Sequence, residues 1–481
     1  MMRFAVLFLI PALLTPAGAG AETPELPEPF HSIVELANAA PPEFAADALL
    51  RIVESNKLAD KDARRELVDK AFQLAGAAKF PVRMMAVPAG NTDTRSASLN
   101  QAYTLKLDLL SLESRAVRDM LPLDRPKARE LFGQMPKPSL VPLTCDDALA
   151  YEPLEFYEAL SAMVNGGFTP EEKAKDEHFK LLLDALGQVM SPSQLPPLSQ
   201  AIESSSVTPA QRQNLWARFN GLLADMQPDD RSFSASLPAL FSVSAPGIEP
   251  ALEKYQQKNH GCETDSGSEP SSRVPAERFQ DTSAADSAAP DTSSPDPSSP
   301  ASSPGSQQRP SKPTTPKLEL FWQSANAKQL LEAGKKLRFS SSSEPLSDAD
   351  RATVGWQQQL SDYLNLIAGW TSDQEGSDAV YYHEKCLVYT SLLDLVAPGP
   401  QGDKILADYV DFISKSSLYQ QSPAEWYVEP HTLLERSHTN VAQHPKVLEA
   451  YQNSGNPVLE LAVALEKTLN GGSPAWAVSA K

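Results

Sequence analysis

The chain has 481 residues, of which 42 are Lys or Arg and 61 are Asp or Glu, so its formal net charge is −19 at pH 7. A charge of this sign and size opposes binding to nucleic-acid phosphates and to anionic lipid surfaces, and no basic run offsets it. The length suffices for two or three ordinary domains. We therefore expect no nucleic-acid partner.

Residues 1–21 are predicted to be a secretory signal peptide. Arg3 precedes an apolar run over 4–14, and small residues follow, ending in Ala19-Gly20-Ala21. This is the order found in signal peptides that end in a cleavage site. The run is shorter than the roughly 20 residues that span a bilayer, which favours cleavage over an uncleaved anchor. We expect an extracytoplasmic protein, periplasmic or secreted, with no membrane span in the mature chain.

Residues 22–263 are predicted to form a helical region. In PPEFAADALLRIVES the side chains of Ala45, Leu49 and Ile52 fall on one helical face, and DKDARRELVDKAFQLAGAA has the same periodicity. The short break NKLAD between them predicts an antiparallel helix pair. Further helices of this region are expected over 146–164, 171–190 and 210–226.

Four possible helix starts share one pattern, beginning at Thr169, Ser191, Thr208 and Ser422. In each, a hydroxyl residue occupies the N-cap, Pro follows at the first helical position, and Glu or Gln stands three residues after the cap. Together these residues predict a capping box. The Ser191 start runs into two further prolines, so it can open one turn at most.

Residues 264–317 have a different composition. This 54-residue stretch contains 14 Ser and 10 Pro and almost no large apolar side chain. Such a segment cannot bury enough surface to offset its chain entropy, which predicts a disordered Ser/Pro-rich segment. It is either a spacer between two regions or an insertion in the surface of one fold.

Residues 318–481 are predicted to be a second helical region. Helices are expected over 325–337, 348–367, 378–395, 404–414, 445–453 and 457–469. Convincing strand patterns are missing along the chain, so the predicted fold is mainly α. Helix pairs with short turns suit an α-solenoid-like array, and an irregular helical bundle is the alternative.

The second region is rich in aromatic residues. It holds 13 of the 18 Tyr and Trp residues in the chain. Aromatic side chains with a polar tip are common in binding sites for sugars and peptides. On that basis Tyr381, Tyr382, Trp426 and Tyr427 are candidate ligand-binding residues, and the alternative is a core built from Tyr and Trp.

The segment DAVYYHEKCLVY brings His383, Glu384 and Cys386 together. His-Glu opens a zinc-protease motif, but Leu387 occupies the position where that motif requires its second His. A buried cysteine on a packed helix is the alternative explanation. The common nucleophile and phosphate-binding motifs are absent from the chain.

The segment PHTLLERSHTNVAQHP holds three of the seven histidines. On a continuous helix His431, Glu435 and His438 share one face, and imidazole and carboxylate groups at such spacings are usual ligands of zinc or iron. His444 does not fit this set, because Pro445 biases it out of helical geometry. Ordinary structural or surface histidines are the alternative.

The three cysteines are too few for a disulfide scaffold. Cys145 and Cys262 both belong to the first region, and we expect them to form a disulfide. Cys386 would then stay reduced and buried, while a Cys262–Cys386 bridge is the rival pairing. Any bridge requires the two Cα atoms to lie within about 7 Å.

These observations favour a protein that binds rather than catalyses. We expect a helical scaffold for another protein or for an envelope polymer, with no predicted cofactor. One alternative is a metal-dependent hydrolase that uses zinc or iron at His431, Glu435 and His438. Another is a purely structural envelope protein.

Overall fold

The computed structural model describes residues 26–28, 30–86, 94–138, 140–227, 229–259, 261–262, 325–340, 343–371, 378–396 and 398–469. The predicted signal peptide and the predicted Ser/Pro segment lie outside these residues. The fold is mainly α, which confirms the prediction. Within the described ranges the named strands are β1 (Met84–Ala86) and β2 (Leu149–Tyr151), which pair antiparallel.

The first region begins with α1 (Phe30–Ala39), α2 (Pro42–Glu54), α3 (Lys61–Ala75), α4 (Thr94–Thr104), α5 (Leu109–Met120), α6 (Arg125–Gln134) and α7 (Leu154–Gly166). It continues with α8 (Pro170–Ala174), α9 (Glu177–Leu186), the 3-10 helix η1 (Pro192–Gln194), α10 (Leu195–Ser204), α11 (Pro209–Asp225), α12 (Asp230–Leu240) and α13 (Ile248–Lys258). Each of the longer helices buries an apolar face, as α2 does with Leu49 and Ile52.

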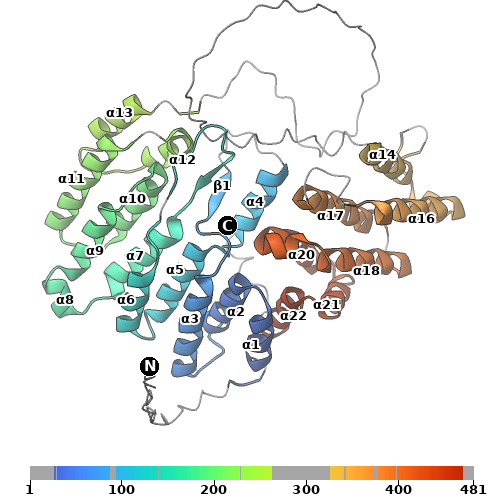
Figure 1. Cartoon of the computed structure of the whole chain (residues 1–481), viewed down its shortest axis with the longest axis horizontal. Helices are drawn as coiled ribbons and strands as arrows, with labels where there is room; N and C mark the ends of the chain where they lie inside the picture. Colours follow the sequence, from blue (N-terminus) through green and yellow to red (C-terminus); the bar gives the residue numbers. More distant parts are fainter. Residues whose placement is uncertain are drawn as a thin grey trace, which may run out of the picture.

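Packing in the first region largely follows chain order. The helices α1, α2, α3, α5, α7, α10, α11 and α13 each pack against the next in that series. The pair α2–α3 is the one predicted around NKLAD, and Asp60 caps the second helix by accepting from the backbone N–H groups of Asp62 and Ala63. The first region therefore has the layered order of a helix array, which Figure 1 shows in blue to green.

The second region contains α14 (Ala325–Arg338), α15 (Asp348–Arg351), α16 (Val354–Gly369), α17 (Asp378–Leu395) and α18 (Pro400–Ser414). It ends with α19 (Leu418–Gln421), α20 (Pro423–His438), α21 (His444–Gln452) and α22 (Pro457–Leu469). Here α14 packs on α16, α17 packs against α18 and α20, and α21 contacts α18, α20 and α22.

The two regions share one hydrophobic core. Helix α22 packs against α1 and α2, and α20 packs against α4. We call this contact between the two regions the seam. Here the rings of Phe44 and Tyr427 meet edge to face with their centroids 5.0 Å apart. Lys57 donates to the carbonyl oxygens of Thr468 and Leu469 at the end of α22, at 2.9 and 3.1 Å, which satisfies carbonyls that a helix terminus leaves open.

The order in space therefore differs from the order in sequence. The first and last described helices, α1 and α22, pack together at the lower centre of Figure 1, where the two regions meet. Helices α13 and α14, which are consecutive in the chain, lie at opposite sides in Figure 1. The seam between α1, α2, α20 and α22 consequently joins chain segments that are about as far apart in sequence as possible.

Three of the four predicted capping boxes are present. Thr169 caps α8, Ser191 caps the single turn η1, and Thr208 caps α11, each with the reciprocal bond from Glu or Gln. At the fourth start α20 begins at Pro423, but the Ser422 side chain makes no capping bond. Glu425, the expected reciprocal partner, is buried and faces His383 instead.

The predicted helix over 146–164 is wrong over residues 146–153. Residues 144–147 form a turn, in which Thr144 N–H donates to Asp147 Oδ2 at 2.7 Å. Strand β2 then pairs with β1, and α7 begins only at Leu154, after Pro153. Strand pairing with a distant segment has overridden local helix propensity here.

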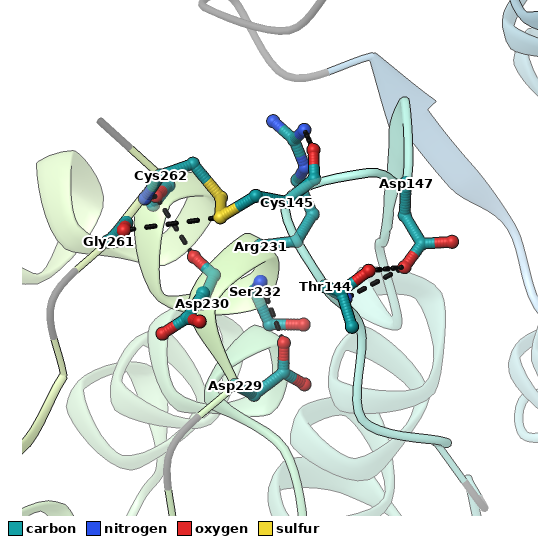
Figure 2. The surroundings of a disulfide bond; sticks show 10 residues. Thr144, Cys145, Asp147, Asp229, Asp230, Arg231, Ser232, Gly261 and Cys262 are labelled. Carbon is teal, nitrogen blue, oxygen red and sulfur yellow. Dashed lines mark hydrogen bonds between the residues drawn. A yellow bond between two sulfur atoms is a disulfide. The ribbon is translucent and has the colours of Figure 1, made fainter. Parts of the chain in front are cut away.

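Cys145 and Cys262 form a disulfide in the first region, with Cα atoms 5.3 Å apart. Arg231, which is buried, donates to the Cys145 carbonyl (Figure 2). Cys262 N–H donates to Ser234 Oγ at 2.9 Å. Gly261 turns the chain into the bridge with a φ of +70°, in the left-handed region. The bridge fixes the segment that follows α13.

Candidate functional site

The four candidate ligand-binding aromatic residues lie in or against the core. Tyr382 and Trp426 are fully buried, and Tyr381 and Tyr427 are half-buried. Trp426 Nε1 donates to the Ile413 carbonyl at 2.9 Å. These surroundings favour the alternative explanation, a core built from Tyr and Trp, over a ligand-binding surface.

A proline explains one of these contacts. Pro430 lies inside α20 and has no N–H, so it cannot donate to the carbonyl of Trp426 one turn earlier. The Tyr382 hydroxyl donates to that carbonyl at 2.8 Å instead. The Pro430 carbonyl in turn accepts from the Tyr451 hydroxyl at 2.7 Å. Tyrosine tips thus satisfy polar backbone atoms of α20 within the core.

His383 takes part in a buried ion pair between α17 and α20. Its Nδ1 lies 2.8 Å from Glu429 Oε1 and its Nε2 lies 3.8 Å from Glu425 Oε1. Burial acts to lower the pKa of His383, but its interactions with the carboxylates of Glu425 and Glu429 outweigh it and raise the pKa to about 9. His383 is therefore charged at neutral pH and bridges the two helices.

Lys385 and Cys386, which follow His383 on α17, are also buried. Cys386 is fully buried and free, as expected, and burial raises the pKa of its thiol well above the ordinary value. A thiol in this state is a poor nucleophile. Lys385 Nζ donates to the Trp370 carbonyl and to the Tyr381 hydroxyl, both at 2.9 Å, and burial lowers its pKa to about 8.

His431 and Glu435 line a small cavity at the seam between the two regions. His431 Nε2 lies 3.9 Å from Glu435 Oε1, and the cavity, of about 40 Å³, is also lined by Asp47 and Arg51 of α2 and by Glu466 of α22. Burial, and then the charge of Arg51, lowers the pKa of His431 to about 4. Burial, and then the charge of Glu466, raises the pKa of Glu435 to about 7.

The structure brings His438 together with residues of the next two helices. His438 Nε2 lies 3.2 Å from Glu466 Oε1, and the rings of His438 and His444 have centroids 4.6 Å apart. One ligand atom each from His438, His444 and Glu466 lies within 4.8 Å of the others. Among the described residues this is the group of three whose geometry suits a metal ion, and it shares only His438 with the predicted set.

Helix packing accounts for this change of partners. Pro445 occupies the first turn of α21, where a proline is tolerated, so His444 begins that helix instead of leaving the site. Helices α21 and α22 pack together, and α21 packs on α20. The spacing of His438 and His444 was visible in the sequence, but no sequence signal singled out Glu466.

A second concave surface lies in the second region, which we call the outer groove. It has a volume of about 720 Å³ and is formed by α15, α16, the end of α17, α18, the 440–443 turn and α21. Its lining combines apolar side chains such as Leu393 and Leu406 with charged groups that are already paired, such as Lys446 with Asp403. The volume falls in the range of ligand sites.

Comparison with known proteins gives no relative: no family model, no curated protein and no solved structure matches the chain. Among the described residues, no helix combines the length and the apolar character needed to cross a bilayer.

Proposed function

We propose that this protein is an extracytoplasmic helical scaffold that binds a segment of another protein in the outer groove. The predicted signal peptide supports the location. The disulfide between Cys145 and Cys262 supports it as well, because such bonds persist in oxidising compartments. The observation that carries the proposed binding role is the outer groove itself.

The rim of the outer groove carries exposed apolar side chains. Val441 is 87% exposed and lies between Asn440 and Ala442, which both line the groove. Val354 is 86% exposed and lies two residues after Ala352, another lining residue. Exposed valines beside a concave surface are favourable contacts for apolar side chains of a partner.

The charged side chains at the outer groove are paired with one another, so the groove does not require a partner segment of one particular charge. Arg436 pairs with Asp394, and Lys446 pairs with Asp403. Since these charges already have partners, the groove offers hydrogen-bonding edges around an apolar floor, which is the usual composition of a protein interface.

A polysaccharide partner is less compatible with this surface. Sugar sites present the open faces of Tyr and Trp rings, but every Tyr and Trp in the described ranges is buried or half-buried. Trp356, which lines the outer groove, is 5% exposed, and its Nε1 donates to the Leu337 carbonyl at 3.0 Å. Of the two expected partner classes, we therefore favour a protein over an envelope polymer.

Site-specific photocrosslinking in the native host tests the proposed function. A photoreactive residue at position 354 or 441 should give the same discrete protein adduct, because both positions border one groove. Val141 is the matched control, since it is an exposed valine (65%) in the first region, and a photoreactive residue there should not give that adduct. Absence of an adduct at 354 and 441, or the same adduct at all three positions, would exclude binding in this groove.

A further inference from the structure

We propose that His438, His444 and Glu466 bind one zinc ion, and that this ion ties α20, α21 and α22 together beside the seam between the two regions. This site is separate from the outer groove, and the proposal does not depend on partner binding there. It also differs from the set expected from sequence spacing, because His431 and Glu435 are not ligands in it.

The first argument is geometric. Zinc sites combine imidazole nitrogens and carboxylate oxygens about 2.0–2.2 Å from the ion, so neighbouring ligand atoms lie a few ångströms apart. The 3.2 Å separation of His438 Nε2 and Glu466 Oε1 fits this spacing directly. The ligand atom of His444 lies within 4.8 Å of both, so small shifts of the three side chains bring them to one ion.

The second argument is a hydrogen bond that orients the His444 ring. Ser437 Oγ lies 2.8 Å from His444 Nδ1 and also donates to the Leu434 carbonyl at 2.6 Å. Hydrogen bonds of this kind orient the histidines that ligate metals. All three proposed ligand residues are half-buried, which leaves them accessible to an ion while limiting the solvent around it.

The third argument is the charge around the site. Glu466 and Glu435 line the same small cavity, so their carboxyl groups repel each other when both are charged, and Glu435 Oε1 is a buried acceptor without a hydrogen-bond partner in the described part of the chain. A divalent cation on Glu466 would offset this repulsion. A water molecule on the ion could also donate to Glu435, since the adjoining cavity of about 40 Å³ has room for water.

The ligand chemistry selects the ion. Two imidazoles and one carboxylate suit zinc, iron and copper better than calcium or magnesium, which prefer all-oxygen sites. Zinc binds such sites more tightly than ferrous iron does, and copper is distinguished by its preference for square-planar coordination. Three protein ligands leave one coordination position of a tetrahedral zinc ion for water.

The test is a calorimetric titration of chelator-treated, full-length protein with Zn²⁺. We expect a saturable event with one ion per chain. His444→Gln and Glu466→Gln should each weaken it about tenfold or more, since even the loss of an outer partner costs about 10–100-fold. His431→Gln is the matched control: His431 lies on the same helix as His438, and its loss should leave the affinity unchanged. Zn²⁺ should also raise the melting temperature of the wild type more than that of the two ligand variants.

Each alternative outcome is informative. Binding that His431→Gln abolishes and His444→Gln leaves intact would place the metal on the sequence-predicted set and overturn the proposal. No saturable binding, or several weak events that none of these variants changes, would overturn it as well. Circular dichroism of the metal-free variants separates loss of a ligand from loss of the fold, and His438→Gln provides a third ligand variant.

Discussion

The two helical regions bury their helices with different chemistry. The first region uses mostly aliphatic and alanine side chains, and it is cross-linked by the Cys145–Cys262 bridge and by Arg115, which pairs with Asp47 at 2.7 Å and with Glu54 at 2.9 Å. The second region adds buried Tyr and Trp residues to its aliphatic core, and polar tips such as those of Tyr382 and Trp426 bond to backbone carbonyls. A core that contains Tyr and Trp depends on hydrogen-bond geometry as well as on side-chain volume, because each buried Tyr hydroxyl or Trp N–H group needs an acceptor.

The seam makes these two chemistries interdependent. Phe44 of the first region lies against Tyr427 of the second, and α22 packs on α1 and α2. The regions differ in how they are held together, yet they contribute to one core. Three variants test how far each region keeps its own stability.

The largest expected effect is loss of the disulfide. In the double variant Cys145→Ser, Cys262→Ser we expect unfolding to require roughly 2–4 kcal/mol less than in the wild type, because the bridge no longer restricts the unfolded chain. Chemical denaturation measures this difference. A thiol reductant should lower the stability of the wild type and have no effect on the double variant.

The control for the disulfide is Cys386→Ala in the second region. It removes the free, buried cysteine, so this variant should keep its full sensitivity to the reductant. Wild-type protein that is indifferent to reductant would contradict the assignment of the stabilising bridge to the first region.

The next effect concerns the seam. Phe44 is 5% exposed, and Phe44→Ala should cost roughly 3 kcal/mol, as removal of a buried ring usually does. Hydrogen exchange should show reduced protection in both regions, in α5 and in α20 alike, because the ring joins them. Phe241→Ala is the control, since Phe241 is 60% exposed and its removal should change stability by less than about 0.5 kcal/mol. Lower protection in the first region alone would mean that the regions unfold independently.

The smallest of the three effects is a pH dependence in the second region. The pKa of His383 is raised from 6.5 to about 9 in the folded protein. Its ion pair therefore stabilises the fold fully below pH 6.5, and this contribution declines as the pH rises through 9. We expect the stability difference between wild type and His383→Gln to be larger at pH 6 than at pH 10.

The comparison with His383→Gln also removes the effect of other titrating groups. Lys385, whose pKa is lowered to about 8, favours folding more as the pH rises above 8, which is opposite in sign to the effect of His383. Lys385 is present in both proteins, so its contribution cancels in the difference. A stability difference that is equal at the two pH values would rule out a charged His383 in the core.

Local signals in the sequence predicted local structure well. Apolar periodicity gave the pair α2–α3, and hydroxyl-Pro-x-Glu/Gln patterns gave the starts of α8, η1 and α11. These features succeed because the interacting atoms are at most four residues apart. The same capping pattern did not predict the contacts of Ser422, which makes no side-chain capping bond. Its expected partner Glu425 instead lies against His383, about 40 residues earlier in the chain.

The candidate metal site shows the limit of such reasoning. The spacing of His431, Glu435 and His438 predicts that they share one face of a helix. Spacing within one helix cannot predict which residues of other helices lie beside that face. The residues that approach His438 come from α21 and α22, and Glu466 is 28 positions away. Their proximity depends on how three helices pack, which the histidine spacing did not encode.

The sequence by itself determined the mainly helical fold, the positions of most helices in the second region and the small number of cysteines from which a bridge could form. The tertiary structure decided that α1 meets α22, that the Tyr and Trp residues in the described part of the second region lie in or against its core, and that His438 faces His444 and Glu466. The physical reason is range: periodicity and capping act within a few residues, whereas burial joins whichever apolar faces fit together, however far apart they lie in the chain.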